Sequence, residues 1–259
     1  MSAVSAVTLA EIAPPAPDGV KSADRAMAIL EVFRQQRRPL SARDLAEALA
    51  MPRSSTNVLL RSLIAGGYLR YSEPGALYYP TLRVFHLGSW LIEGLLDDPA
   101  LDRALRDLAA RTGETVCLWA RIGLQLAAVA VIEGPQAISL HVRTGIAAPL
   151  FGSTVGLALL AALGDAERER LLTRQQQTGP AVDLDLTLRE VEGTRQRGWC
   201  AGYDRWLPDA GAVAAALALP GAAEPLVIGV GGPTFRVRRN EARIADELTA
   251  TLARRWGVG

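Results

Sequence analysis

The stretch "LSARDLAEALAMPRSSTNVLLRSLIAGGYLRY", residues 40–71, has the pattern of two short helices followed by the start of a β-strand. Ser41, with an acidic residue three positions later, has the pattern of a capping box at the start of the first helix. Pro52 suits the first turn of the second helix, and Gly66 and Gly67 end it. The order of these signals predicts a helix-turn-helix.

Segments on both sides extend this unit. Before it, "SADRAMAILEVFRQQ" places apolar residues such as Ile29 and Phe33 at the spacing of one helix face. After it, "YLRY" and "ALYYP" flank the turn signal "SEPG", which is typical of a β-hairpin. Helix, helix, turn, helix and hairpin together predict a winged helix-turn-helix at residues 21–80. The Ala- and Pro-rich residues 1–20 before it are expected to be a flexible tail.

Basic charge is concentrated in this N-terminal block. The whole chain of 259 residues has a net charge of only +1, which argues against a wholly basic nucleic-acid protein. Residues 21–83, however, contain ten Arg or Lys and five Asp or Glu, a local net charge of +5. Lys21 is the only lysine, so every other base is an arginine, whose planar fork fits phosphates and guanine edges.

The second helix of the helix-turn-helix begins with polar residues suited to reading DNA. A helix fits the major groove, where Asn can pair with adenine and Arg can reach phosphate or guanine. The same helix is expected to bury Val58 or Leu59 together with Leu63. The alternative is that its polar face is only a solvated surface. The candidate DNA contacts are Ser41, Arg43, Arg53, Ser54, Ser55, Thr56, Asn57, Arg61 and Arg70.

The remaining sequence predicts a linker and a second domain. Residues 81–96 are expected to form a helix whose apolar side chains pack either on their own domain or on a second copy of the chain. Residues 97–259 interleave predicted strands, such as "TVCLWARI" and "AISLHVRT", with predicted helices, such as "GSTVGLALLAAL". This irregular alternation predicts a mixed α+β sheet domain.

Several quoted segments together resemble one family. They are "KSADRAMAILEVF", "YYPTLRVFHLG", "GETVCLWAR", "VRTGIAAPLFGSTVGLALLAAL", "RQRGWCAGYDRWLPDAGAVAAALALP" and "IGVGGPTFRV". In this order and spacing they resemble the IclR family of bacterial transcription regulators. The resemblance implies an α+β protein in which a winged helix-turn-helix is joined by a linker helix to a GAF-like mixed α/β effector-binding domain.

The resemblance also implies partners. A homodimer or homotetramer is expected, since two DNA-binding heads about 34 Å apart can read a palindromic operator in double-stranded DNA. The second domain is expected to sense a small-molecule effector, with a carboxylate as the candidate ligand. RNA polymerase is a further candidate partner. Because only a difference in ligand affinity between two arrangements of the dimer can move the heads, effector binding and DNA binding are expected to be coupled.

The helix that starts within "FGSTVGLALLAAL" is a candidate anion site. Its first N–H groups, near Gly152, Ser153 and Thr154, can hold a carboxylate, although Ser153 can instead simply cap the helix. Small residues stand where the family often has polar ones, which favours an aromatic or bulkier acid as ligand. Aromatic residues gather nearby, and their alternative role is packing in a core or an interface. The candidate effector-binding residues are Trp119, Arg121, Gly152, Ser153, Thr154, Gly202, Tyr203, Ala212, Gly229 and Gly231.

Other protein classes find little support in the sequence. The only histidines are His86 and His141, and neither lies near a second metal ligand. No HExxH, G-x-S-x-G or P-loop motif is present, so we expect no enzyme, metal or cofactor. The competing interpretation is a winged-helix protein-interaction module, or a ligand sensor that does not read DNA directly. The two cysteines, Cys117 and Cys200, lie far apart, and neither a signal peptide nor a membrane helix is expected; this pattern fits a reducing cytoplasm.

Overall fold

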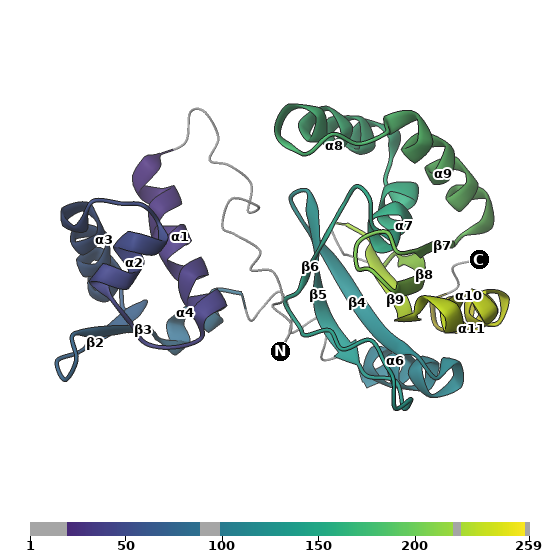
Figure 1. Ribbon diagram of the computed structural model, residues 1–259, viewed down its shortest axis with the longest axis horizontal. Helices are drawn as coiled ribbons and strands as arrows, with labels where there is room; N and C mark the ends of the chain where they lie inside the picture. The colour runs from purple at the N-terminus through teal and green to yellow at the C-terminus, as the bar shows by residue number, and fades with distance from the viewer. Residues whose placement is uncertain (1–19, 89–98, 220–223, 257–259) are drawn as a thin grey trace. The chain divides into compact units, whose positions relative to one another are not determined.

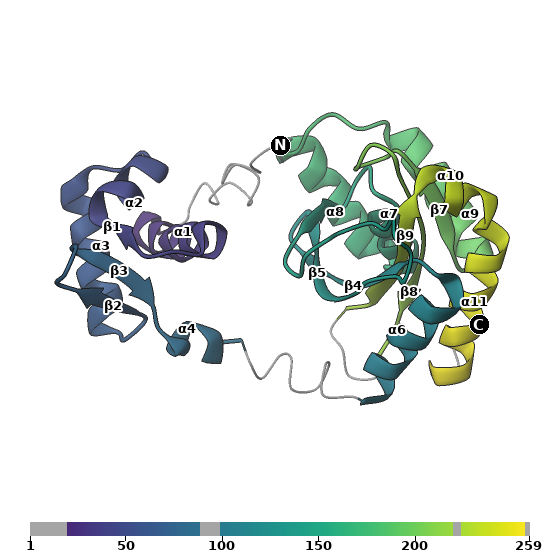
Figure 2. The same cartoon turned by 60° about the horizontal axis from the view of Figure 1, so that its bottom comes forward.

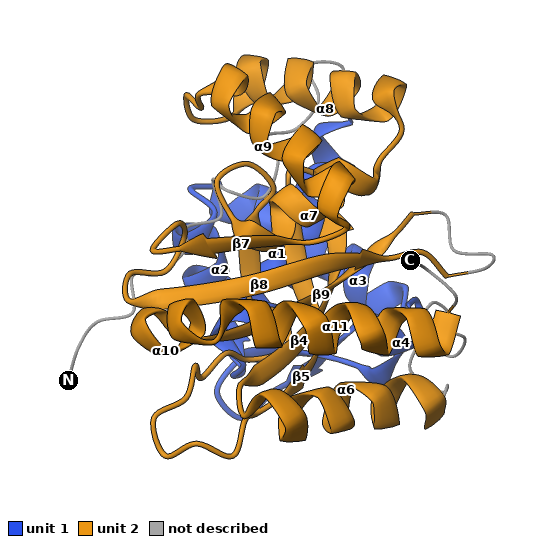
Figure 3. Cartoon of the chain, turned by 90° about the vertical axis from the view of Figure 1, so that its right-hand side faces the viewer, with its two compact units in different colours: residues 1–97 blue, residues 98–259 orange. Residues whose placement is uncertain are grey.

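The computed structural model describes residues 20–88, 99–219 and 224–256. The chain divides into two units, residues 1–97 and 98–259, which Figure 3 shows in different colours. Of the predicted tail, only Val20 is described. Of the predicted linker helix at residues 81–96, only the part up to residue 88 is described.

The N-terminal unit is a small helical bundle with a β-hairpin, as Figures 1 and 2 show. Its short sheet is antiparallel in the order β1-β3-β2, so the hairpin is joined to the segment before the second helix. The elements are α1 (Lys21–Gln36), β1 (Leu40–Ser41), α2 (Ala42–Ala48), α3 (Arg53–Ala65), β2 (Leu69–Ser72), β3 (Leu77–Pro80) and α4 (Leu82–His86).

The capping box predicted for α2 is confirmed. The Ser41 N–H donates to Asp44 Oδ2 at 2.8 Å, and the Asp44 N–H donates to Ser41 Oγ at 3.1 Å. The Ser41 hydroxyl also donates to Asp44 Oδ2, at 2.9 Å. The two bonds that the Asp44 carboxylate accepts, from the Ser41 N–H and hydroxyl, hold the pKa of Asp44 below its usual value, because they favour the charged form. The two reciprocal bonds satisfy donors that would otherwise be free at the helix start, so they fix where α2 begins.

The buried face of α3 includes predicted residues and is centred on two that were not predicted. Leu60 and Thr56 are 0% exposed and lie one turn apart, facing a core that includes Ile29 and Phe33. Of the two predicted alternatives, Leu59 packs against this core and so does Leu63, both partly buried. The other alternative, Val58, is 51% exposed. It lies two residues from each buried position, about 200° around the helix, and therefore points to the opposite side.

The C-terminal unit is one antiparallel sheet between two helical layers. The strands run in the order β6-β5-β4-β9-β8-β7. Helices α7, α8 and α9 lie on one side of the sheet, and α6, α10 and α11 on the other (Figures 1 and 3). Its elements are α6 (Pro99–Thr112), β4 (Thr115–Ile122), β5 (Gln125–Ile132), β6 (Ala147–Pro149), α7 (Thr154–Ala162), α8 (Asp165–Thr178), α9 (Leu184–Arg197), β7 (Cys200–Tyr203), β8 (Ala210–Leu217), β9 (Leu226–Pro233), α10 (Thr234–Arg239) and α11 (Glu241–Trp256).

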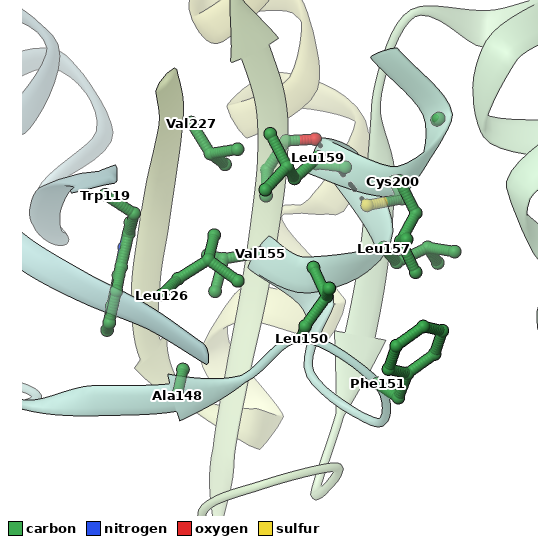
Figure 4. Close-up of a cluster of buried hydrophobic side chains, with 14 of the residues drawn as sticks. Trp119, Leu126, Ala148, Leu150, Phe151, Val155, Leu157, Leu159, Cys200 and Val227 are labelled. Carbon is green, nitrogen blue, oxygen red and sulfur yellow. Dashed lines mark hydrogen bonds between the residues drawn. The ribbon is translucent and has the colours of Figure 1, made fainter. Parts of the chain in front are cut away.

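Helix α7 is the centre of this unit's core. Its side chains are buried all round, and Figure 4 shows Val155 and Leu159 beside Leu126 and Val227 of the sheet. At Gly156 a Cβ would clash with the carbonyl group of Leu150, so only glycine lets the helix approach this loop so closely. The helix start is thereby held against the sheet, where a cavity opens.

The segment "AISLHVRT", residues 137–144, is a loop and not the predicted strand. Its alternation of apolar and polar residues is real, since Val142 is buried and Leu140 packs against the core. The Thr115 hydroxyl donates to the Leu140 carbonyl at 2.9 Å, which holds the loop by a side chain instead of a strand ladder. The α+β class predicted from the sequence is nevertheless confirmed. Within the described residues no helix has the length and hydropathy needed to cross a membrane.

Candidate nucleic-acid interface and ligand cavity

One face of α3 is polar, exposed and basic. Arg53, Ser54, Asn57, Val58 and Arg61 are all exposed on it. Within the part of the chain that the structure describes, neither Arg53 nor Arg61 forms an ion pair. Both guanidinium groups are therefore available to an anionic partner such as a phosphate.

Other predicted contacts have local roles in the N-terminal unit. Thr56 is fully buried and its hydroxyl donates to the Pro52 carbonyl at 3.2 Å, so its side chain does not reach the surface. Ser55 is half-buried. Arg43 is exposed but pairs with Glu47 at 2.7 Å, and this hydrogen bond raises the pKa of Arg43 above its usual value.

The hairpin presents a second basic position. Arg70 on β2 is exposed, and its guanidinium lies 5.3 Å from the ring centroid of Tyr79 on β3. A cation–π contact of this kind orients the side chain without neutralising its charge. Sequence reasoning did not place Val58 on the exposed face of α3. Its position directly after Asn57 and three residues before Arg61 could have indicated that it shares their side of the helix.

The C-terminal unit contains a cavity of about 60 Å³ at the start of α7. Strands β4, β8 and β9, the loop at residues 137–144 and the turn after β7 enclose it. Trp119 and Trp206 form one wall, with ring centroids 6.1 Å apart and planes at 85°. The lining residues are Thr115, Cys117, Trp119, Leu140, Val142, Ser153, Thr154, Val155, Gly202, Arg205, Trp206, Leu207, Ala210, Gly211, Ala212, Gly229 and Gly231.

Glycines give the cavity its floor. A Cβ at Gly229 would lie 2.9 Å from Val155 Cγ1, and one at Gly231 would lie 3.0 Å from Leu140 Cδ2. At Gly202 a Cβ would clash with the Thr154 hydroxyl. Glycine at these positions therefore lets Val155, Leu140 and Thr154 approach the strand backbone closely around the cavity.

The structure gathers seven of the ten predicted effector-binding residues around this cavity, and three lie elsewhere. The seven are Trp119, Ser153, Thr154, Gly202, Ala212, Gly229 and Gly231, and the three are Arg121, Gly152 and Tyr203. The alternation of a β-strand explains Tyr203, since it follows Gly202 on β7 and points to the opposite face of the sheet.

The three residues outside the cavity have other surroundings. Arg121 Nε donates to Glu224 Oε2 at 2.8 Å, and this hydrogen bond raises the pKa of Arg121. The Tyr203 hydroxyl donates to Glu241, while burial raises the pKa of Tyr203 to about 12. Gly152 lines a second cavity of about 180 Å³.

Ser153 caps α7, as the alternative interpretation of its hydroxyl predicted. Its Oγ accepts from the Gly156 N–H at 3.0 Å and donates to the Pro149 carbonyl at 2.5 Å. Thr154, which is 6% exposed, makes no hydrogen bond through its hydroxyl within the described residues. The hydroxyl of Thr154 is therefore a polar group left for a ligand in this cavity.

Arg205 is the cavity residue that sequence reasoning missed. It lies in the turn between β7 and β8 and lines both the 60 Å³ cavity and the 180 Å³ cavity. A signal was present, because Arg205 is the only basic residue between Gly202 and Pro233. A guanidinium beside a mostly apolar cavity requires a polar or charged partner.

Both thiols are expected to be unreactive in the folded protein. Burial raises the pKa of Cys117 and of Cys200 from 9.0 to about 12, which lowers the thiolate fraction about 1,000-fold. Iodoacetamide at pH 8 should therefore label the native protein far more slowly than the urea-unfolded protein, as intact mass would show. Rapid native labelling of Cys117 would show that the cavity opens widely.

Comparisons with known proteins identify both units. Residues 22–73 match the IclR helix-turn-helix domain, and residues 99–255 match the C-terminal domain of the bacterial transcriptional regulator IclR. The HTH-type transcriptional regulator XynR of Escherichia coli (strain K12) is 27% identical over 184 residues, which are 70% of this chain and 73% of XynR. The HTH-type transcriptional repressor AllR of the same strain is 25% identical over 245 residues, 93% of this chain and 90% of AllR.

Solved structures share the fold. An IclR family transcriptional regulator from Brucella abortus has a TM-score of 0.72 and 24% identity, covering 92% of each chain. A regulator from Alicyclobacillus acidocaldarius has a TM-score of 0.70 and 21% identity, covering 91% of this chain and 97% of its own. Since the C-terminal family domain alone spans more than half of the residues, the chain belongs to the IclR family and is a bacterial transcriptional regulator, not an enzyme, with a helix-turn-helix DNA-binding domain and a C-terminal effector domain.

Proposed function

We propose that the exposed face of α3 enters the major groove of an operator. The observation that supports this most directly is the division of the helix: Leu60 anchors it in the core, while Arg53, Asn57 and Arg61 share the exposed side. Asn57 is suited to adenine, and the arginines to guanine or phosphate. Exposed Val58 between them can contact a thymine methyl group.

The remaining predicted contacts serve the DNA backbone in this proposal. Phosphates would be contacted from three elements. The residues are Ser41 and Arg43 at the start of α2, Ser54 and Ser55 on α3, and Arg70 on the hairpin. Thr56 is withdrawn from the set because it is fully buried. Backbone contacts of this kind fix the position of the head without reading the sequence.

We propose that the chain acts as a homodimer or homotetramer on a palindromic operator in the cytoplasm. One head makes few contacts, whereas two heads a helical turn apart read two half-sites. Leu82 is 77% exposed and Phe85 is 62% exposed within the predicted linker at residues 81–96. This exposure supports packing of the linker on a second copy over burial on its own domain. RNA polymerase remains a proposed partner.

We propose that the 60 Å³ cavity binds the effector, and that the effector is a small organic acid. The support is the wall of two tryptophans combined with Thr154 and Arg205 as polar groups. A cavity that holds benzene measures about 150 Å³, so an aromatic acid requires the wall to move. Movement of the Arg205 side chain would join this cavity to the larger one beyond it.

Salt dependence tests direct DNA binding. If two heads neutralise about six phosphates, affinity for the upstream DNA should fall about 1,000-fold between 50 and 200 mM salt, because each contact releases counterions. A fluorescence-anisotropy titration of the labelled intergenic fragment at four salt concentrations measures the slope. The competing winged-helix protein-interaction module predicts no such affinity and no steep slope.

A further inference from the structure

Arg205 is placed between an otherwise uncharged cavity and the Glu190 side chain of α9. It is the only charged residue lining the 60 Å³ cavity within the described residues. Its guanidinium end forms an ion pair with Glu190 on α9, with Nη1 donating to Glu190 Oε2 at 3.1 Å. Both side chains are partly exposed, at 27% and 28%. Because water reaches both side chains, another anion can compete with Glu190 for the guanidinium.

Two polar groups without partners converge beside Gly202. Arg205 Nε makes no hydrogen bond within the described residues, since its ion pair uses only the two terminal nitrogens. A Cβ at Gly202 would lie 2.8 Å from Arg205 Nε and would clash with the Thr154 hydroxyl. The absence of a side chain at Gly202 thus lets the Arg205 side chain and the Thr154 hydroxyl approach the same point of the β7 backbone, where both line the cavity.

We propose that Arg205 selects a carboxylate ligand by exchanging Glu190 for it. This inference rests on the proposed effector function of the same cavity. The ligand's carboxylate accepts from the Arg205 guanidinium and from the Thr154 hydroxyl, and its apolar part lies against Trp119 and Trp206. A guanidinium matches a carboxylate with two parallel hydrogen bonds, which a neutral amide cannot reproduce.

The exchange couples the ligand to α9. With the ligand bound, Glu190 loses its partner, and the contact between the β7–β8 turn and α9 is lost. The wall that Arg205 forms between the two cavities moves in the same step. Because the ligand binds only the arrangement in which Glu190 has released Arg205, ligand binding shifts the population toward that arrangement.

Calorimetry on the full-length protein tests the exchange. The probes are propionate, isobutyrate, benzoate and phenylacetate, each compared with its primary amide. Arg205→Gln should weaken acid binding about 10- to 100-fold and leave amide binding unchanged, because a hydrogen bond to a charged group is lost. Glu190→Gln should strengthen acid binding about fivefold, because the competing anion is removed.

A matched control is Arg195→Gln on the same helix, since Arg195 pairs with Asp165 and lines neither cavity. It should leave acid affinity unchanged. Hydrogen exchange provides a second measurement: an acid should speed exchange in residues 184–197 of the wild-type protein and not of Arg205→Gln.

Three results would overturn the exchange. They are unchanged acid affinity in Arg205→Gln, weaker acid binding in Glu190→Gln, and amides that bind the wild-type protein as tightly as the acids. Failure of every acid in the panel to bind would also reject a carboxylate ligand. A gel shift on the same preparation reports separately whether the chain binds its operator, so failure of the exchange and failure of DNA binding are distinguishable.

Discussion

Replacing Arg53 and Asn57 together by alanine is expected to weaken operator binding at least about 100-fold. Each good base contact contributes about 1–3 kcal/mol of discrimination, and the loss occurs in both heads of a dimer. Both side chains are exposed on α3, so their removal should leave the core around Leu60 intact. A gel shift on the DNA upstream of the chain's own operon measures the change, and circular dichroism verifies the fold.

The matched control for this pair is Arg106→Ala. Arg106 is an exposed arginine on α6 that pairs with Asp102 at 2.7 Å in the C-terminal unit. Its removal changes the net charge as the loss of Arg53 does, but leaves α3 untouched. Equal weakening by both variants would mean that binding follows total charge, and unchanged binding by the double variant would exclude α3 as the reading helix.

Arg236→Met is expected to destabilise the C-terminal unit by about 3–5 kcal/mol. Glu114 is 1% exposed, and Arg236 holds it with a hydrogen bond of 2.6 Å from Nη2 to Oε2 and a second one from Nε. Removing the guanidinium leaves a buried carboxylate without its counter-ion. Urea unfolding followed by tryptophan fluorescence measures the loss, since Trp119, Trp199 and Trp206 all belong to this unit.

Two further variants separate the ion pair from simple packing. Adding Glu114→Gln to Arg236→Met removes the buried charge, so the double variant should be more stable than Arg236→Met alone. Arg238→Met, on the same short helix, removes only a guanidinium that lies 4.5 Å from the Tyr203 ring centroid at the exposed surface. Arg238→Met should lower the free energy of unfolding far less than Arg236→Met does. If the double variant is as unstable as Arg236→Met alone, the lost stability comes from packing and not from the buried charge of Glu114.

The helix-turn-helix could be predicted because its signals are local. The capping box at Ser41 and the glycines after α3 act within a few residues of chain. The choice among Val58, Leu59 and Leu60 could not be settled in the same way. Which of three adjacent apolar residues is buried depends on where α1 packs, and this is tertiary information. The position of α3 in the chain could be predicted from the sequence, but which of its faces is buried depends on the packing of α1.

The lining residues of the cavity could be predicted where they lie on one face of a strand or at the start of α7. Gly229 and Gly231 alternate on β9 and so share a face, whereas Tyr203 lies on the face opposite Gly202. Arg121 does not line the cavity, and its pairing with Glu224, 103 residues away in the sequence, could not be read from a local pattern. Arg205 was missed because a turn residue has no periodicity that would show which side it faces.

The glycines of the proposed effector cavity offer a route to changing its ligand specificity. A Cβ at Gly231 would lie 3.0 Å from Leu140 Cδ2, the end of a loop side chain that can move, and 3.6 Å from the Gly211 carbonyl oxygen. A substituent at Gly202 would instead strike the Thr154 hydroxyl. A mutant library that diversifies position 231, with Gly202 kept constant, would change the contour of the site one methyl group at a time. Biosensors responding to new metabolites could then be selected from this scaffold without redesigning its β-sheet.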